Sequence, residues 1–231
     1  MINKQQVYIV IPAYNEESII NSVIKKLRRN GYHNIVVIDD GSQDNTAQIA
    51  THAGAKVLRH FINRGQGAAL QTGLEYIREN FQPEVIITFD ADGQHRPQDI
   101  SRLIQPIIKN QADIVLGTRF LNKKHAQSVP FWRRVMLKTA VWFTTLISGV
   151  RLTDTHNGLR ALGPTAYQQL KITRRGMEHA SEIIDHIKKH GWRYQEVPVK
   201  INYTDYSQAK GQPTSNFIKL GLKILLHKLM N

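Results

Sequence analysis

The chain has 231 residues, 41% of them hydrophobic, which is enough for one α/β domain with a substantial core. It contains no cysteine, which excludes disulfides and thiolate metal sites and agrees with a cytoplasmic protein. The net charge of +13 indicates a polyanionic partner, which could be nucleic acid, an anionic membrane or a phosphorylated substrate.

The first half of the chain alternates strand-like and helical segments. Apolar runs predict strands at 7–13, 34–40, 56–60, 84–90 and 113–119, and the segments between them predict helices at 16–29, about 44–53, about 66–80 and after Pro97. Apolar runs without polar alternation are typical of strands that are covered on both faces. Helices of this length between strands are typical of parallel crossovers. The expected fold is therefore α/β, with a mostly parallel, Rossmann-like sheet flanked by helices.

After residue 120 the pattern changes. The segments predict an exposed loop at 123–130, an apolar helix at 131–150, a second helix at 178–190, a strand at 192–203 and a last helix at 214–230. We expect a catalytic domain over residues 1–203, followed by a loop and an amphipathic helix over 204–231. No apolar stretch is long enough for a signal peptide or reaches the roughly 20 residues of a transmembrane helix. The helices at 131–150 and 214–230 are instead expected to lie in a membrane interface.

Acidic residues follow three of the predicted strands. They are Glu16 and Glu17 after the first strand, Asp39 and Asp40 after the second, and Asp90 and Asp92 after the fourth. Ligands bind at the carboxyl ends of the strands in an open parallel sheet, so these carboxylates should converge on one edge. Their mutual repulsion there predicts a cation or a hydrogen-bond-donating ligand.

Asp90 and Asp92 are separated by one residue, Ala91, at the end of an apolar strand. They can offer two oxygen ligands to one Mg²⁺ or Mn²⁺, with Gln94 as a neutral third ligand, and leave room for phosphate oxygens and water. An isolated Asp-x-Asp more often caps a helix, but its position at a strand end favours a metal site. A dinucleotide-binding fold is disfavoured because PAYNEE follows the first strand where that fold has Gly-x-Gly-x-x-Gly.

Four segments together resemble the family 2 glycosyltransferases with a GT-A fold. They read IPAYNEE, VVIDDGSQDNT, NRGQGAALQTG and FDADGQHRPQDI, and the resemblance covers residues 6–165. The closer resemblance is to polyprenyl-phosphate sugar synthases, such as dolichyl-phosphate mannose synthase and bacterial undecaprenyl-phosphate glycosyltransferases. These motifs are specific for the fold and the reaction type, but not for the sugar.

The resemblance implies a role for each matching residue. The nucleotide-sugar site would comprise Pro12, Tyr14, Glu16, Ile38, Asp39, Asp40, Asp90, Ala91, Asp92 and Gln94, of which Asp90, Asp92 and Gln94 would hold the metal. The acceptor phosphate would contact Arg119, Arg133, Arg134 and Lys138, and the catalytic groups would be Asp92, Arg119 and Lys210. The segment DTHNGLR (154–160) resembles the Asp-x-x-x-Gly-x-Arg stretch of these synthases. Their Arg-x-x-Gly-x-Ser-Lys segment is not matched, and Lys210 stands in the corresponding loop.

The expected reaction is inverting transfer of a hexosyl or N-acetylhexosaminyl group from a UDP- or GDP-sugar to a polyprenyl phosphate such as undecaprenyl phosphate. The product would be a lipid-linked donor for cell-envelope glycans. A lipid phosphate needs no general base, because its second pKa is about 6 and it is already an anion at neutral pH. A glycan hydroxyl would need a base, for which the candidates are Glu178, Glu182 and Asp185.

Three other functions agree with parts of the sequence. They are a family 2 transferase acting on a glycan hydroxyl, a metal-dependent nucleotidyltransferase and a basic nucleic-acid-binding protein without enzymatic activity. Nucleic acid is not expected as a partner, since no binding motif occurs and the acidic cleft would repel phosphate without a metal. A lipid acceptor places the chain at the cytoplasmic face of the membrane, attached peripherally to anionic lipid or through a small membrane protein or a second copy.

Overall fold

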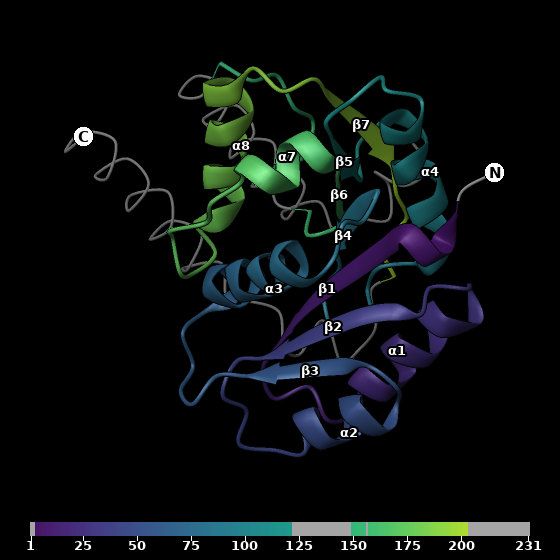
Figure 1. Cartoon of the computed structure of the whole chain (residues 1–231), viewed down its shortest axis with the longest axis vertical. Helices are drawn as coiled ribbons and strands as arrows, with labels where there is room; N and C mark the ends of the chain where they lie inside the picture. Colours follow the sequence, from purple (N-terminus) through teal and green to yellow (C-terminus); the bar gives the residue numbers. More distant parts are fainter. Residues whose placement is uncertain (1–2, 122–148, 156, 203–231) are drawn as a thin grey trace.

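The structure is a computed structural model that describes residues 3–121, 149–155 and 157–202 (Figure 1). In this part of the chain, seven strands form one sheet in the order β3-β2-β1-β4-β6-β5-β7. Strand β6 runs antiparallel to its neighbours β4 and β5, and all the other pairs are parallel. The prediction of an α/β fold with a mostly parallel sheet is confirmed.

The elements follow the predicted order. The strands are β1 (Val7–Ala13), β2 (Asn34–Asp39), β3 (Lys56–Arg59), β4 (Val85–Thr88), β5 (Ile114–Thr118), β6 (Arg160–Leu162) and β7 (Tyr194–Pro198). The helices are α1 (Ile20–Arg29), α2 (Thr46–His52), α3 (Gln66–Asn80), α4 (Pro97–Ile108), α7 (Pro164–Gln169) and α8 (His179–His190), with a 3-10 turn η1 (Lys4–Gln6) before β1. The sequence pattern did not predict β6 or α7, and β7 is shorter than the predicted strand at 192–203.

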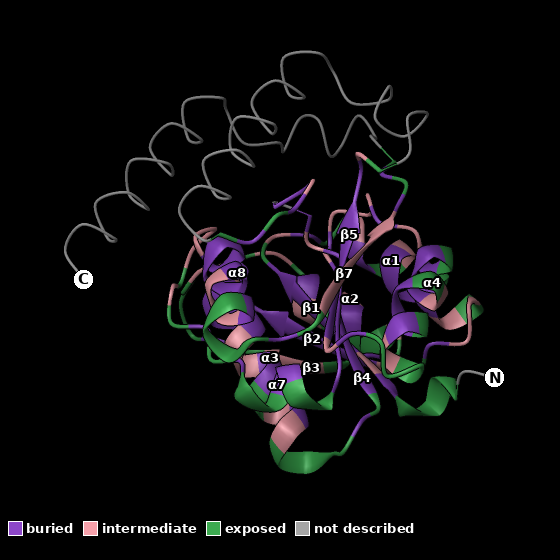
Figure 2. Cartoon of the chain, turned by 90° about the horizontal axis from the view of Figure 1, so that it is seen from above, coloured by how far each residue is buried: buried purple, intermediate pink, exposed green. Residues whose placement is uncertain are grey.

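Helices cover both faces of the sheet, as the continuous Val/Ile runs predict. On one face, α1, α2 and α4 pack against side chains such as Ile9 and Ile11. On the other face, α3, α7 and α8 pack against the alternate side chains of the same strands, including Val10 and Ile38. Figure 2 shows the buried strands between these helices. The core therefore has two apolar layers, one on each side of the sheet.

Helix α1 begins later than the pattern predicts. Its apolar residues recur at helical spacing from Ile20 onward, but residues 16–19 form a turn before it. The backbone N–H of Glu16 donates to Thr46 Oγ1 at 2.7 Å, and that of Glu17 donates to Asp44 Oδ2 at 3.2 Å. These contacts tie the turn after β1 to the loop after β2. The two glutamates therefore lie in the turn at the carboxyl edge of the sheet, before the helix begins.

Several predicted elements lie outside the described residues. They are the loop at 123–130, nearly all of the helix at 131–150, and the loop and helix at 204–231. None of the helices that the structure does describe is long and apolar enough to cross a bilayer.

Gly73 provides a test of the packing between α3 and the sheet. A Cβ atom at this position would lie 2.5 Å from Val10 Cγ1 and 3.2 Å from Ile38 Cγ1. We expect Gly73→Ala to lower the free energy of unfolding by about 1–3 kcal/mol, because overpacking outweighs the better helix propensity of alanine. Chemical denaturation measures this change. The exposed α1 substitution Lys25→Ala is the control and should stay within about 0.5 kcal/mol of the wild type. Equal stability of the two variants would contradict the tight α3–sheet contact.

Candidate active site

The sheet order brings the predicted acidic residues to one edge. Strands β2, β1 and β4 are consecutive neighbours and run parallel, so the residues that follow them meet at the carboxyl edge. Burial and the charge of Asp90 raise the pKa of Asp92, after β4, and the charge of Glu16, after β1, adds to this rise. The predicted convergence of carboxylates is therefore present.

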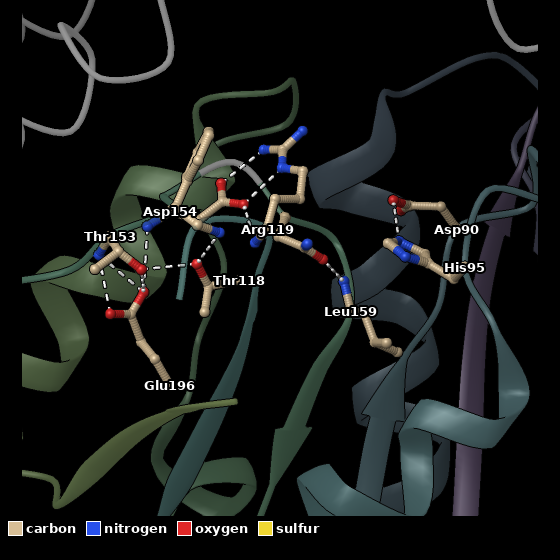
Figure 3. A network of polar contacts seen from close by, with 10 residues as sticks. Asp90, His95, Thr118, Arg119, Thr153, Asp154, Leu159 and Glu196 are labelled. Carbon is tan, nitrogen blue, oxygen red and sulfur yellow. Dashed lines mark hydrogen bonds and ion pairs between the residues drawn. The ribbon is translucent and has the colours of Figure 1, made fainter. Parts of the chain in front are cut away.

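Asp90 is held on three sides, and Figure 3 shows one of these contacts, that with His95. Gln66 Nε2, at the start of α3, donates to Asp90 Oδ1 at 3.1 Å. His95 Nε2 lies 2.9 Å from Asp90 Oδ2. On the third side lies the backbone of Gly158, where a Cβ atom would fall 2.1 Å from Asp90 Oδ2. Any side chain at residue 158 would therefore displace the carboxylate.

The two aspartates of the Asp-x-Asp pair have opposite pKa shifts. Burial disfavours the charged form of Asp90, but the hydrogen bond and charge of His95 and the charge of Arg160 hold its pKa below the usual value. Burial, and then the charge of Asp90, raise the pKa of Asp92 to about 6. The ionised form of Asp92 is therefore destabilised by the charge of Asp90, and a bound cation would relieve this repulsion.

The turn after β4 carries oxygen ligands of the kind that a hard divalent cation prefers. The Gln94 N–H donates to Asp92 Oδ1 at 2.9 Å, which fixes the turn that carries both residues. Within residues 3–121, 149–155 and 157–202, no group of three or more histidine, aspartate or glutamate side chains is arranged to hold a metal ion. Mg²⁺ is commonly bound by one or two carboxylates together with substrate phosphates. The residues present fit such a site, in which the substrate completes the shell.

The two aspartates that follow β2 are engaged by the protein. Asp40 accepts hydrogen bonds from the backbone N–H groups of Arg64 at 2.9 Å and Gly65 at 2.7 Å, and its Oδ1 lies 2.7 Å from His60 Nδ1. Asp39 accepts from the Ser42 N–H at 3.2 Å, and the Arg59 Nε lies 3.0 Å from its other oxygen. Both side chains are buried.

The rest of the predicted nucleoside pocket lies on the same strands. Pro12 in β1 and Ile38 in β2 are register partners, and both are buried. Tyr14 follows β1 and is partly exposed, Glu16 is buried in the next turn, and Ala91 is buried between the two aspartates of the pair. The structure thus brings together the ten residues predicted for the nucleotide-sugar site along the ends of β1, β2 and β4.

Arg119, at the end of β5, lies apart from this group. Its Nε and Nη2 each lie 2.6 Å from an oxygen of Asp154, in a buried bidentate pair (Figure 3). Glu196, on β7, accepts from the backbone N–H of Thr153 at 2.9 Å and from that of Asp154 at 3.2 Å, which supports the pair from below. A phosphate bound by Arg119 would therefore share its guanidinium with Asp154.

The segment 154–160 contacts both parts of the site. Asp154 pairs with Arg119, and Gly158 lies against Asp90. Arg160 interacts electrostatically with Asp90 and with Asp154. Thr88 Oγ1 also donates to the Gly158 carbonyl at 2.6 Å, which fixes this segment to β4. The Asp, Gly and Arg of the recognised motif each have a structural reason to be there.

Two buried donors on the segment that packs against Asp90 have no hydrogen-bond partner among the described residues. They are Arg160 Nη1 and Asn157 Nδ2, and Nδ1 of His95, the ring that contacts Asp90, is likewise without one there. A buried unpaired donor costs about 1–3 kcal/mol, and such groups in native structures are often explained by function. His179, at the start of α8, completes the surroundings of Asp90. Burial, and then the charge of Arg160, lower the pKa of His179 to about 4, so its imidazole is neutral at pH 7.

The three candidate bases for a hydroxyl acceptor differ in their contacts. Glu182 accepts hydrogen bonds from the N–H groups of Thr173 and Arg174, both at 2.9 Å. Asp185 lies 3.6 Å from Arg174 Nη2. Glu178 is half-buried at the start of α8. Glu182 therefore supports the backbone before α8.

The sequence motifs contained residues whose roles the pattern did not reveal. Gln66, His95 and Gly158 stand in segments that carried the family resemblance, but their spacing gave no sign that they meet at Asp90. His179 occurs in no motif. The predicted acceptor residues Arg133, Arg134 and Lys138, and the predicted catalytic residue Lys210, lie outside the described residues.

The fold and the Asp-x-Asp pair at the carboxyl end of β4 define the chain as a glycosyltransferase of the GT-A fold. Residues 8–157 match the sequence profile described as glycosyl transferase family 2, and the chain belongs to that family. The expected family is thereby confirmed.

Two archaeal proteins are similar over nearly their whole length. An uncharacterized protein of Methanocaldococcus jannaschii is 39% identical, covering 99% of this chain and 94% of its own. The UDP-N-acetylglucosamine--dolichyl-phosphate N-acetylglucosaminyltransferase of Methanococcus voltae is 36% identical, covering 97% and 95%. Among solved structures, Mycobacterium tuberculosis glucosyl-3-phosphoglycerate synthase has a TM-score of 0.71 at 18% identity, covering 95% of this chain and 77% of that one. At this identity the structural similarity shows the fold alone.

Gly158→Ala tests the contact that positions Asp90. We expect the added Cβ to displace the carboxylate and to weaken Mn²⁺ binding by about 10–100-fold, the usual cost of disturbing a group that orients a metal ligand. Titration of the free protein with Mn²⁺, followed by electron paramagnetic resonance, measures the affinity. Gly176→Ala is a matched control, since its Cβ would meet the end of the Glu178 side chain at 2.5 Å, which can move away. Equal Mn²⁺ affinities in both variants would contradict the positioning role of Gly158.

Proposed function

We propose that this glycosyltransferase moves a sugar from a nucleotide-sugar to a polyprenyl phosphate, with Mg²⁺ or Mn²⁺ as cofactor and with inversion at the anomeric carbon. The observation that carries the proposal is the fixed Asp90 carboxylate beside Asp92, at the edge where the ends of β1 and β2 also meet. Relatives support the choice of acceptor. The Methanococcus voltae relative is named for dolichyl phosphate, and a Mycolicibacterium smegmatis relative, 27% identical over 73% of this chain, is named polyprenol monophosphomannose synthase.

The donor is proposed to bind along the ends of β1, β2 and β4. UDP-N-acetylglucosamine is the first donor to test, because the name of the Methanococcus voltae relative includes it. A solved complex of glucosyl-3-phosphoglycerate synthase, with a TM-score of 0.69 to this chain, is described with Mn²⁺ and UDP-glucose, which agrees with a metal-dependent use of this edge. Asp90, Asp92 and Gln94 would hold the ion, which would supply positive charge to stabilise the departing diphosphate.

The chain's own residues prepare this site for the donor. Gln66 and His95 hold Asp90 in one orientation, so little reorganisation is needed when the donor binds. The unpaired donor groups of Arg160 and Asn157 lie on the segment that packs against Asp90, where they are suited to oxygen atoms of a bound ligand. The neutral His179 adds no positive charge at this point.

A phosphate acceptor agrees with the contacts of Glu182, one of the three candidate bases. A hydroxyl acceptor needs a carboxylate that is placed to take its proton, whereas a phosphate anion does not. Glu182 is committed to the backbone of Thr173 and Arg174. The enzyme's task is then to hold the phosphate in line with the anomeric carbon, about 3 Å away. Arg119 together with Arg133, Arg134 and Lys138 is proposed to do this, and Lys210 to approach the donor phosphates.

A direct assay separates the proposed acceptor from its main rival. Radiolabelled UDP- and GDP-sugars are incubated with undecaprenyl or dolichyl phosphate in detergent, and label is counted in the organic phase. Transfer to lipid supports the proposal. Label that appears only in an added glycan would instead show a family 2 transferase acting on a hydroxyl. Because its acceptor cannot leave the bilayer, the chain is proposed to work peripherally at the cytoplasmic face of the membrane.

Asp90→Asn and Asp92→Asn test the metal site. We expect each to lower kcat/KM by about a hundredfold or more, since substitution of residues that only hydrogen-bond to metal ligands already lowers metal affinity or activity about 10–100-fold. Turnover of the wild type should stop in excess chelator and return with Mn²⁺. Glu84→Gln is the control, because Glu84 is exposed just before β4, at the opposite edge of the sheet from Asp90. Full activity of the wild type in chelator would refute metal dependence.

Arg134→Gln combined with Lys138→Gln tests the acceptor site. The two residues stand four apart, so on the predicted helix they share a face. We expect the KM for polyprenyl phosphate to rise about tenfold or more, because hydrogen bonds to charged groups contribute about 1.5–3 kcal/mol. The KM for the nucleotide-sugar should stay unchanged. Lys25→Gln, on the surface of α1, is the control. Unaltered acceptor kinetics in the double variant would remove this role.

A further inference from the structure

The loop between β3 and α3 carries the most exposed large apolar side chains in the part of the chain that the structure describes. Phe61 is fully exposed, at 105% of its reference area, and Ile62 is 71% exposed. The other exposed large apolar residues there range from 37% to 50%. Single exposed apolar residues are ordinary. Two adjacent exposed apolar residues at a loop tip, one of them a fully exposed aromatic residue, are less common.

The loop is held in place at both ends. The buried carboxylate of Asp40 contacts His60 on one side of the tip, and the N–H groups of Arg64 and Gly65 on the other. The backbone of Ile62 also packs against Gly41, where a Cβ would lie 2.6 Å from the Ile62 carbonyl carbon. The exposure of Phe61 and Ile62 is therefore built into the loop, because the same contacts that fix its ends direct its tip outward.

Positive charge surrounds the base of this loop. The segment before α8 docks on the N-terminus of α3, where the Gly67 N–H donates to the Arg175 carbonyl at 2.7 Å. Figure 1 shows this segment and the β3–α3 loop on the same side of the molecule. The two segments, 56–65 and 171–177, together contain six lysine and arginine residues and no acidic residue, although Arg59 pairs with Asp39 and Arg174 lies 3.6 Å from Asp185. Among these cations, Arg64 and Arg175 are exposed and stand next to the glycines where the two segments meet.

We propose that Phe61 and Ile62 insert into the interface of an anionic lipid bilayer, with Arg64 and Arg175 contacting lipid phosphates. Apolar side chains beside cations, without intervening acids, are the composition of interfacial membrane contacts. The loop follows the carboxyl end of β3, on the edge that carries Asp90. Inserting it would turn that edge toward the surface that contains a polyprenyl phosphate. The proposal deepens the proposed function and rests on it for this orientation.

Charge complementarity favours lipid over a second copy of the chain. A second copy would bring the same cations to the contact, together with a net charge of +13. Like charges facing each other across an interface oppose association. An anionic bilayer has the opposite sign, and each nearby lysine or arginine adds to its attraction.

Flotation of the full-length chain with vesicles tests the proposal without any substrate. The vesicles contain phosphatidylcholine alone or phosphatidylcholine with about 30% phosphatidylglycerol. We expect the wild type to float with the anionic vesicles at low salt. Phe61→Ser combined with Ile62→Ser should lower the partition coefficient about tenfold or more, because each side chain loses its transfer from water. Arg64→Gln with Arg175→Gln should weaken binding and reduce its salt dependence.

The control is Phe81→Ser, since Phe81 is 37% exposed at the end of α3, away from this edge. Thermal unfolding checks that each variant is folded. Equal flotation of the wild type and the Phe61/Ile62 variant would overturn the proposal, as would a wild type that stays in the soluble fraction. A wild-type dimer that becomes monomeric in this variant, seen by light scattering, would show an interface between copies instead. Vesicle binding without sugar transfer to lipid would refute the proposed function and leave this proposal standing.

Discussion

The repulsion among carboxylates at one edge of the sheet is the constraint on which the site is built. Parallel neighbours β2, β1 and β4 all end at this edge, and acidic residues follow each of them. Buried charges are stable only when they are paired or hydrogen-bonded. The structure meets this requirement by giving each inner carboxylate its own donors. Asp40 accepts from two backbone N–H groups, and Asp39 accepts from one and forms an ion pair with Arg59. Asp90 is held by the side chains of Gln66 and His95.

The number of hydrogen-bond donors at each carboxylate distinguishes the aspartates that support the structure from the one suited to bind a ligand. Asp39 and Asp40 are buried and hold the loops that follow β2 and β3, so their main effect on the site is to shape its wall. Asp92 differs, because among the described residues its hydrogen-bond donor is the nearby Gln94 N–H, and because burial and then the charge of Asp90 raise its pKa to about 6. A carboxylate that the protein leaves under-compensated is suited to a ligand that brings positive charge. Of the four aspartates that follow β2 and β4, Asp92 is therefore the one best suited to bind a cation.

Periodicity and motif spacing predicted the frame of the molecule well. Helix α3 occupies the predicted residues 66–80, and the strands of the first half start within a residue of their apolar runs. The Asp-x-Asp pair could also be placed, because a strand end is recognisable in sequence. Contacts between distant segments could not be predicted. Nothing in the spacing shows that Gly158 fills the space beside Asp90 or that Asp154 takes both nitrogens of the Arg119 fork.

The short strand β6 explains why these distant contacts exist. In a parallel sheet, only residues that follow strands reach the carboxyl edge. An antiparallel strand reverses this, and β6 brings the residues that precede it to the same edge. Its first residue, Arg160, pairs with Thr88 near the end of β4 and with Leu116 near the end of β5. The described residues just before β6, 154, 155 and 157–159, therefore reach this edge, where Gly158 meets Asp90 and Asp154 pairs with Arg119. A three-residue strand without an apolar run is nearly invisible in sequence, yet it joins the proposed donor and acceptor sides of the site.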